Sequence, residues 1–244
     1  MKAALVCVLG LAFAAGCAHA PPERKAPEPV VVQAPPPPPP KVEPPEEMQV
    51  AGTLGSLTDE EMGAPFQQRW SDITACYQQA KARLWYLGGK VELKVRVAAS
   101  GDPKSVFVSS STVGNYQAEH CILEIARGLH FAKPHGGAEA EFTYPIELGD
   151  RAAVQTWDGA RVRPALARHR RDVTQCRQKS PTRLPSDLML TVYVAPGGKV
   201  TSAGLAADAP LDDTFASCLV QKTHKWRLDD PLGRIAKCTV EVSR

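Results

Sequence analysis

The stretch Val91-Glu92-Leu93-Lys94-Val95-Arg96-Val97 decides the fold of the chain, because its aliphatic and charged residues alternate strictly. A period of two predicts a β-strand with one buried and one wet face. Ser100-Gly101-Asp102 follows as a turn, and residues 105–109 return as a second strand. The stretch Leu188-Met189-Leu190-Thr191-Val192-Tyr193-Val194 alternates in the same way and predicts a second hairpin about a hundred residues later. Its outward residues are less polar, so we expect the neighbouring module or a partner to cover that face.

Helices are expected before and after each hairpin. Before the first hairpin, one apolar stripe at helical spacing contains Phe66, Trp70, Ile73, Tyr77, Ala80 and Leu84. Before the second hairpin, the corresponding stripe contains Val162, Ala165, Leu166, His169, Val173 and Cys176. Further helices are expected over about 115–128 and 211–226, and last strands over 140–144 and 235–242.

The two hairpins belong to a faint internal repeat. At a constant offset of 97, Val91, Gly101, Cys121 and Pro134 correspond to Leu188, Gly198, Cys218 and Pro231. An offset of 100 relates Cys76 to Cys176, and an offset of 96 relates Phe142 to Cys238. We therefore expect an α+β fold made of two tandem α-β-β-α-β modules, over residues 48–150 and 151–244. Each module should hold a three-stranded antiparallel sheet in the order 2-1-3, with both helices on one face.

The first module resembles a known family. The residues that carry the resemblance are Leu57-Thr58-Asp59-Glu60-Glu61, Cys76-Tyr77, Gly89-Lys90-Val91, Ser110-Ser111-Thr112-Val113-Gly114-Asn115, Cys121-Ile122 and Phe142-Thr143-Tyr144-Pro145. They resemble the AgmX/PglI C-terminal domain, which belongs with TonB/TolA-like C-terminal modules and is known from gliding-motility proteins. Residues 55–148 match this pattern well and residues 160–242 match it weakly. The resemblance implies a binding module that accepts an extended peptide at a sheet edge, and it brings no catalytic residues.

The N-terminus predicts export and lipid attachment. Lys2 precedes an apolar segment over 3–15, which is too short for a transmembrane helix and ends in Ala14-Ala15-Gly16-Cys17. Small residues before a cysteine resemble the lipobox of bacterial lipoproteins, so residues 1–16 are the expected signal peptide and Cys17 the expected lipidation site. Ordinary secretory cleavage near Ala18-His19-Ala20 is the alternative. We expect a protein anchored by lipid to the outer membrane and facing the periplasm.

A proline-rich linker is expected between this anchor and the folded part. Twelve of the 22 prolines lie within residues 21–45, and such density favours an extended polyproline II spacer without a packed core. The remaining composition, with 43% hydrophobic residues overall, is that of a globular protein and excludes a fully disordered or collagen-like chain. No later stretch approaches the ~20 apolar residues of a membrane-spanning helix.

The cysteines predict two disulfides. Five of the seven lie beyond Cys17, in an exported chain where disulfides are expected. If both helices of each module cover the same sheet face, the natural pairs are Cys76–Cys121 and Cys176–Cys218. Cys238 would remain unpaired and point inward.

Charge is distributed unevenly between the modules. Residues 48–150 contain 9 Lys/Arg and 12 Asp/Glu, whereas residues 151–244 contain 16 and 9. A basic second module suggests an anionic partner, and the alternative is a merely solvated helix surface. The candidate binding residues on its first helix are Arg163, Arg170, Arg171 and Arg177, with Arg161 and Arg168 beside them. On the last strand, Lys237, Thr239 and Glu241 should lie along an open edge that is longer than the first module's, because Pro145 interrupts the latter.

The leading functional hypothesis is a membrane-anchored periplasmic protein-interaction module of an envelope or gliding-motility assembly. The alternative is a peptidoglycan-associated structural lipoprotein that uses the arginine-rich helix. Enzymatic activity is not expected, since GxSxG, HExxH and phosphate-binding glycine loops are all missing from the sequence. No cofactor or nucleic-acid partner is expected. A zinc site is not expected either, since the histidines and cysteines form no CxxC or HxxxH pair.

Overall fold

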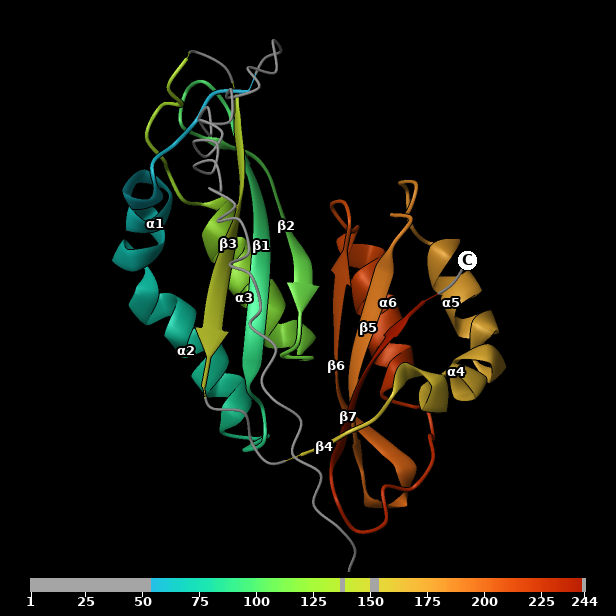
Figure 1. The fold of residues 1–244 in the computed structure, drawn as a ribbon. Coiled ribbons are helices and arrows are strands. Elements are labelled where there is room, and N and C mark those ends of the chain that lie inside the picture. The colour runs from blue at the N-terminus through green and yellow to red at the C-terminus, as the bar shows by residue number, and fades with distance from the viewer. Residues whose placement is uncertain (1–53, 137–138, 150–153, 243–244) are drawn as a thin grey trace, which may run out of the picture. The chain divides into compact units, whose positions relative to one another are not determined.

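The computed structural model describes residues 54–136, 139–149 and 154–242, which form an α+β fold with two β-sheets (Figure 1). Contacts group residues 50–244 into one compact unit that contains both sheets. The signal peptide, Cys17 and the proline-rich linker lie outside the described residues. None of the described helices has the length and apolar character needed to cross a bilayer.

The first half of this unit contains a three-stranded antiparallel sheet in the order β2-β1-β3, as expected. Its elements are, in chain order, α1 (Asp59–Gln68), α2 (Trp70–Lys81), β1 (Gly89–Val97), β2 (Pro103–Ser111), α3 (Tyr116–Arg127) and β3 (Ala140–Leu148). Thr58 and Glu61 form a capping box at the start of α1, and the Asn115 side chain caps α3. Burial alternates along β1, and its aliphatic side chains point at the helices.

The second half contains a mixed four-stranded sheet in the order β4-β7-β5-β6. Its elements are β4 (Gln155–Thr156), α4 (Gly159–Arg168), α5 (Arg170–Arg177), β5 (Leu188–Ala195), a 3₁₀ turn η1 (Pro196–Gly198), β6 (Lys199–Ala207), α6 (Asp213–Thr223) and β7 (Ala236–Glu241). The expectation of three strands here was wrong, because β4 pairs in parallel with the start of β7. Two residues are too few to give a recognisable alternation, so the sequence pattern does not reveal this strand.

The first helix of each half is broken into two, which the single apolar stripes did not predict. The breaks fall at Arg69 and His169, and both residues leave the helical region of backbone angles at φ near −100°. A proline lies shortly before each break, at Pro65 and Pro164, where it removes a backbone donor and bends the helix. Trp70 follows the first break and is 38% exposed, although the stripe placed it toward the core.

The strands of the two halves pair in corresponding registers. Val95 faces Val106 and Phe142 in the first sheet. Val192 faces Ala203 and Cys238 in the second, at the offsets of 97 and 96 seen in the sequence. Cys238 is a buried free thiol, as expected, and burial raises its pKa to about 11, so it remains protonated.

Both predicted disulfides are present. Cys76–Cys121 joins α2 to α3, and Cys176–Cys218 joins α5 to α6, with Cα–Cα distances of 5.8 and 5.6 Å. Each bond therefore fastens two helices that cover the same face of their sheet (Figure 1). Each half also has its own hydrophobic core beneath these helices.

The other face of the two sheets differs between the halves. In β1 the outward residues are wet and ion-paired, and Lys94 Nζ lies 2.9 Å from Glu141 Oε1. In β5 the corresponding residues Thr191 and Tyr193 are buried. The Thr191 hydroxyl donates to the Ser111 carbonyl, and the Tyr193 ring packs 5.1 Å from the Tyr86 ring. The first half therefore covers this face of the second.

A buried carboxylate joins the halves at this contact. Glu119 of α3 is 1% exposed, and its Oε1 accepts hydrogen bonds from the Ser111 hydroxyl at 2.6 Å and the Gly114 N–H at 2.9 Å. Its Oε2 accepts from the Leu205 N–H of β6 at 3.3 Å. Burial raises the pKa of Glu119, whereas these donors favour the charged form and oppose the shift. Ser202 of β6 adds a hydrogen bond to the Gly114 carbonyl at 2.7 Å.

Candidate site for an anionic partner

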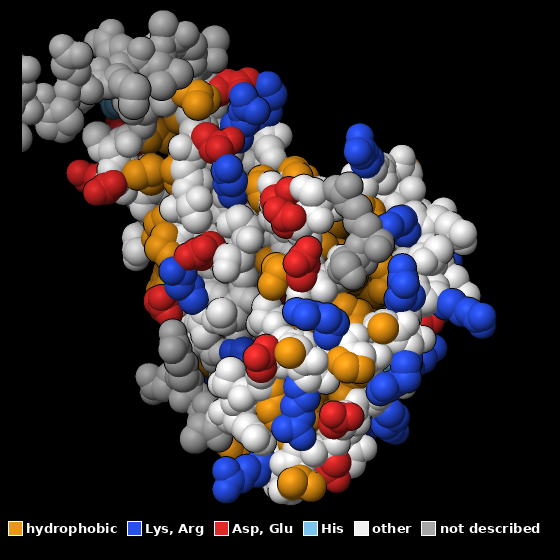
Figure 2. Space-filling view, turned by 45° about the vertical axis from the view of Figure 1, so that its right-hand side comes forward, with side chains coloured by type: hydrophobic (Ala, Val, Ile, Leu, Met, Phe, Trp, Pro, Cys, Tyr) orange, Lys and Arg blue, Asp and Glu red, His pale blue; other side chains and the backbone are white. Residues whose placement is uncertain are grey.

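The basic side chains of the second half gather on α4 and α5. The Asp158 side chain caps the start of α4, and an apolar stripe that includes Val162, Leu166 and Val173 is buried against the sheet. Because one face of each helix is held in the core, the arginines between these positions project outward. Figure 2 shows Lys and Arg side chains along the right-hand side of the view, with hydrophobic side chains between them.

Three of the arginines line one hollow of about 230 Å³. Arg170 and Arg177 lie seven residues apart on α5, which is close to two helical turns and keeps them on one side of that helix, and Arg163 lies on α4 before the break. The hollow is lined by these three arginines and by Leu166, Ala167, Val173, Thr174 and Val242. It therefore combines a row of positive charge with an aliphatic floor.

The three guanidinium groups make no hydrogen bond or ion pair with any described residue. Arg161 differs, because it lies 4.3 Å above the Trp157 ring and 3.9 Å from the Asp229 carboxylate. The Nε atom of Arg177 is buried without an acceptor among the described residues. We call the surface formed by Arg163, Arg170, Arg177 and the aliphatic floor the arginine hollow.

The remaining arginines of this region lie outside the arginine hollow. Arg168 and Arg171 are exposed on the same helix pair, so they add to the positive field without lining the hollow. Sequence inspection named the three lining arginines but missed the contributions of Ala167, Thr174 and Val242. The seven-residue spacing of Arg170 and Arg177 could have indicated a common side of α5, whereas Val242 follows β7, far along the chain, and needed the tertiary fold.

The edge of β7 is not open, so that prediction was wrong. The Trp157 N–H donates to the Lys237 carbonyl at 2.8 Å, and Gly159 packs against the Thr239 carbonyl. Residues 155–159 thus run along the strand that was expected to accept a partner. Thr239 also contacts the Thr191 hydroxyl at 2.9 Å, Lys237 Nζ donates to the Gly88 carbonyl at 3.1 Å, and Glu241 is exposed near the strand end.

The edge of β3 is free by contrast. No strand among the described residues pairs with its outer side, and the segment at Leu54–Ser56 bonds only with residues that precede the strand. Pro145 lacks a backbone donor, and proline is tolerated in an edge strand when its nitrogen faces away from the neighbouring strand. β3 therefore offers an open edge in the described part of the first half.

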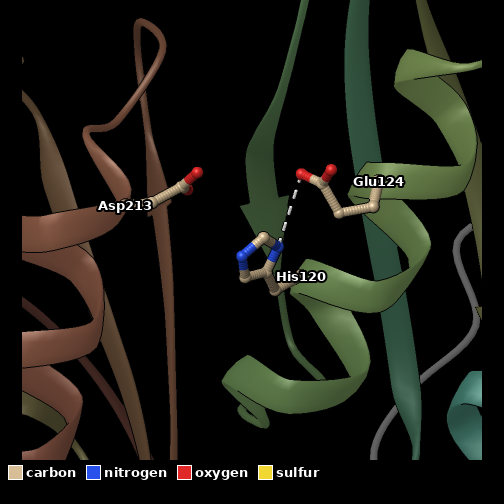
Figure 3. Close-up of side chains that lie close together, drawn as sticks. All are labelled: His120, Glu124 and Asp213. Atoms are coloured by element: carbon tan, nitrogen blue, oxygen red, sulfur yellow. Dashed lines mark ion pairs between the residues drawn. The ribbon is translucent and has the colours of Figure 1, made fainter.

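One cluster has the residue types of a metal site but is already occupied by a cation from the protein. His120, Glu124 and Asp213 place one ligand atom each within 4.8 Å of one another, and it is the one such group among the described residues (Figure 3). Arg127 Nη1 lies 2.5 Å from Glu124 Oε1 and 3.5 Å from Asp213 Oδ2. The guanidinium pairs with both carboxylates, so the cluster acts as an ion-pair bridge between α3 and α6.

Comparisons with known proteins supply no further assignment. No protein-family model matches the chain, and no curated protein or solved structure matches it either.

Proposed function

We propose that the chain is a periplasmic interaction protein of the bacterial cell envelope that binds an anionic partner through the arginine hollow. In this proposal the lipid on Cys17 holds it at the outer membrane and the proline-rich linker extends from that anchor. The resemblance of residues 55–148 to TonB/TolA-like modules and the two disulfides support an exported binding protein. The observation that carries the proposal is one hollow lined by three arginines whose guanidinium groups pair with no described residue.

The physical reason is that these charges have no partners among the described residues. Surface arginines in folded proteins are commonly screened by nearby carboxylates, as Arg96 and Arg127 are in this structure. Three guanidinium groups that pair with no described residue and line one hollow produce a local positive potential that attracts anions. A planar guanidinium binds a carboxylate or phosphate through two parallel hydrogen bonds.

Binding to isolated envelope fractions tests the proposal. The full mature chain should bind them at low salt and dissociate near 1 M salt, where the Debye length falls to ~3 Å. The variant Arg163→Gln/Arg170→Gln/Arg177→Gln should lose this binding. A matched variant, Arg83→Gln/Arg183→Gln/Arg234→Gln, removes the same charge from exposed positions outside the hollow and should bind normally. Equal loss in both triple variants would contradict a localised site.

A second candidate function is strand addition at β3. The free outer edge of β3 is the observation that favours it, because exposed backbone donors and acceptors can pair with an extended peptide. Thr143 shares the parity of Pro145, so its N–H should face outward. Thr143→Pro should then abolish peptide binding in a folded protein, while Thr143→Ala should not. Normal binding by a folded Thr143→Pro variant would rule out this edge.

A further inference from the structure

We propose that the arginine hollow takes an extended acidic segment of a partner protein, in which carboxylates about three residues apart alternate with aliphatic side chains. This inference rests on the proposed function and specifies its ligand. The evidence is the spacing of the charges, the nature of the floor and the size of the hollow.

The spacing of the arginines favours a ligand with several separate charges. Seven residues of α-helix rise by about 10 Å, so Arg170 and Arg177 are separated along α5, and Arg163 lies on α4 before the break at His169. An extended polyproline II segment rises by about 9 Å over three residues and returns every third side chain to the same face. Carboxylates three residues apart would therefore match the spacing of Arg170 and Arg177 along α5.

The floor of the hollow favours a peptide with aliphatic side chains. Leu166, Val173 and Val242 are buried for most of their surface but border the hollow, so they offer apolar contacts between the charged groups. Thr174 adds a hydroxyl at the rim, although that hydroxyl also donates to the Arg170 carbonyl at 3.0 Å. No aromatic ring belongs to the lining, so nothing in the hollow stacks against a sugar ring.

The volume of the hollow is consistent with side chains rather than with a whole small molecule. At about 230 Å³ it lies below the range of roughly 300–1,000 Å³ that is typical of pockets for small ligands. It also leaves little room for a long acyl chain, which makes a lipid a poorer fit than a peptide. A segment that places one or two aliphatic side chains in the hollow and its carboxylates on the rim uses both features.

Peptide binding to the full mature chain tests the inference. The probe is a fluorescein-labelled peptide with three Glu-Val-Pro repeats, and binding is followed by fluorescence anisotropy at low salt. Three control peptides isolate its features: Gln-Val-Pro repeats remove the charge, Glu-Ser-Pro repeats remove the aliphatic group, and a peptide of the same composition places its three glutamates side by side. We expect each control to bind at least about tenfold more weakly, as the loss of a charged hydrogen bond or an apolar contact predicts.

Two protein variants locate the site. Ala167 is exposed in the lining, so Ala167→Trp should fill the hollow while keeping every arginine, and it should weaken binding about as much as Arg170→Gln. Arg183→Gln, outside the hollow, should change binding by less than about twofold, because a distant exposed charge contributes little. Circular dichroism of each variant checks that the fold is retained. Normal peptide binding by folded Ala167→Trp, or equal binding of the clustered-glutamate peptide, would overturn the inference.

The same variants separate this inference from the proposed function. Purified cell-wall sacculi and vesicles of anionic phospholipid serve as competing ligands. If sacculi or vesicles bind in an arginine-dependent way and the Glu-Val-Pro peptide does not, the inference is wrong and the proposed anionic partner stands. If no ligand or envelope fraction depends on the three arginines, both are wrong.

Discussion

Corresponding strand positions are exposed to solvent in the first half of the folded unit and buried in the second half. In the first half, Arg96 lies on the wet face of β1 and pairs with Glu139. At the corresponding position of β5, Tyr193 is fully buried against the first half. A sheet whose outer face is already covered must meet a partner elsewhere, and the arginine-bearing side of α4 and α5 is one exposed surface of the second half. Because this sheet face is exposed in one half and buried in the other, the similar strand order does not imply a similar binding surface.

Truncation of the corresponding residues Tyr193 and Arg96 should give the largest difference in stability between the two halves. Tyr193→Ala should lower the free energy of unfolding by about 3–5 kcal/mol, as expected when a large buried aromatic side chain is removed. Arg96→Ala, at the equivalent wet position, should cost no more than about 1 kcal/mol. Urea unfolding of the two variants measures both values. Similar losses would show that the two faces are not differently covered.

The disulfides should behave alike in the two halves, in contrast to the sheet faces. The bonds close loops with sequence separations of 45 and 42 residues, for which the chain-entropy model gives about 4 kcal/mol each. The variants Cys76→Ser/Cys121→Ser and Cys176→Ser/Cys218→Ser should therefore lose nearly equal stability. Thermal unfolding under non-reducing conditions compares them. A loss confined to one half would mean that the other half is held mainly by its neighbour.

Replacement of Glu119 should give a smaller loss of stability, and this loss should depend on pH. Glu119→Gln replaces an acceptor by an amide donor that faces backbone N–H groups, so it should cost on the order of 1–3 kcal/mol. Because the folded pKa of Glu119 is raised, the unfolded chain releases this proton first as the pH increases. The difference in free energy of unfolding between the wild type and Glu119→Gln should therefore become smaller as the pH rises. This decrease should begin near the ordinary pKa of glutamate and end above the raised pKa of Glu119 in the folded protein.

Denaturant unfolding at several pH values checks this sign. Glu124→Gln is the control on the same helix, where the carboxylate is exposed and pairs with Arg127. Its effect should remain within about 1 kcal/mol. An advantage of the wild type that grows with pH would mean that the hydrogen bonds to Glu119 outweigh its burial.

The smallest expected effect concerns the wet face of the first half. Lys94→Ala removes the exposed ion pair with Glu141 and should change stability by about 0–1 kcal/mol at low salt. The effect should disappear near 1 M salt, since screening already removes the attraction. Unfolding at two salt concentrations measures it. A larger, salt-insensitive loss would indicate that Lys94 has a packing role.

Much of each half could be predicted from the sequence because its pattern is local. The alternation of residues 91–97 and 188–194 indicated the central strands, and the corresponding offsets indicated the registers and cysteine pairs. The low polarity of Met189, Thr191 and Tyr193 also predicted that their face would be covered.

The features that escaped prediction depend on tertiary contacts. β4 is two residues long and blocks β7 only because the chain returns alongside that strand. Glu119 occupies an apolar helical position beside Ile122 and Leu123, a signal of a special role, but its donors come from both halves. The arginine hollow likewise needs Val242, which comes from the end of the chain, to complete a surface begun by α4 and α5.

Site-specific photocrosslinking in intact cells tests the central claim most directly. A photoreactive residue is placed at Ala167 or Thr174 in the arginine hollow, at Lys94 on the wet face of β1, or at Thr143 on the free edge of β3. We expect crosslinked adducts from Ala167 and Thr174. These adducts should disappear when the three arginines of the arginine hollow are replaced by glutamine. Adducts formed only from Lys94 or Thr143, or adducts at the hollow that persist without the arginines, would contradict the central claim.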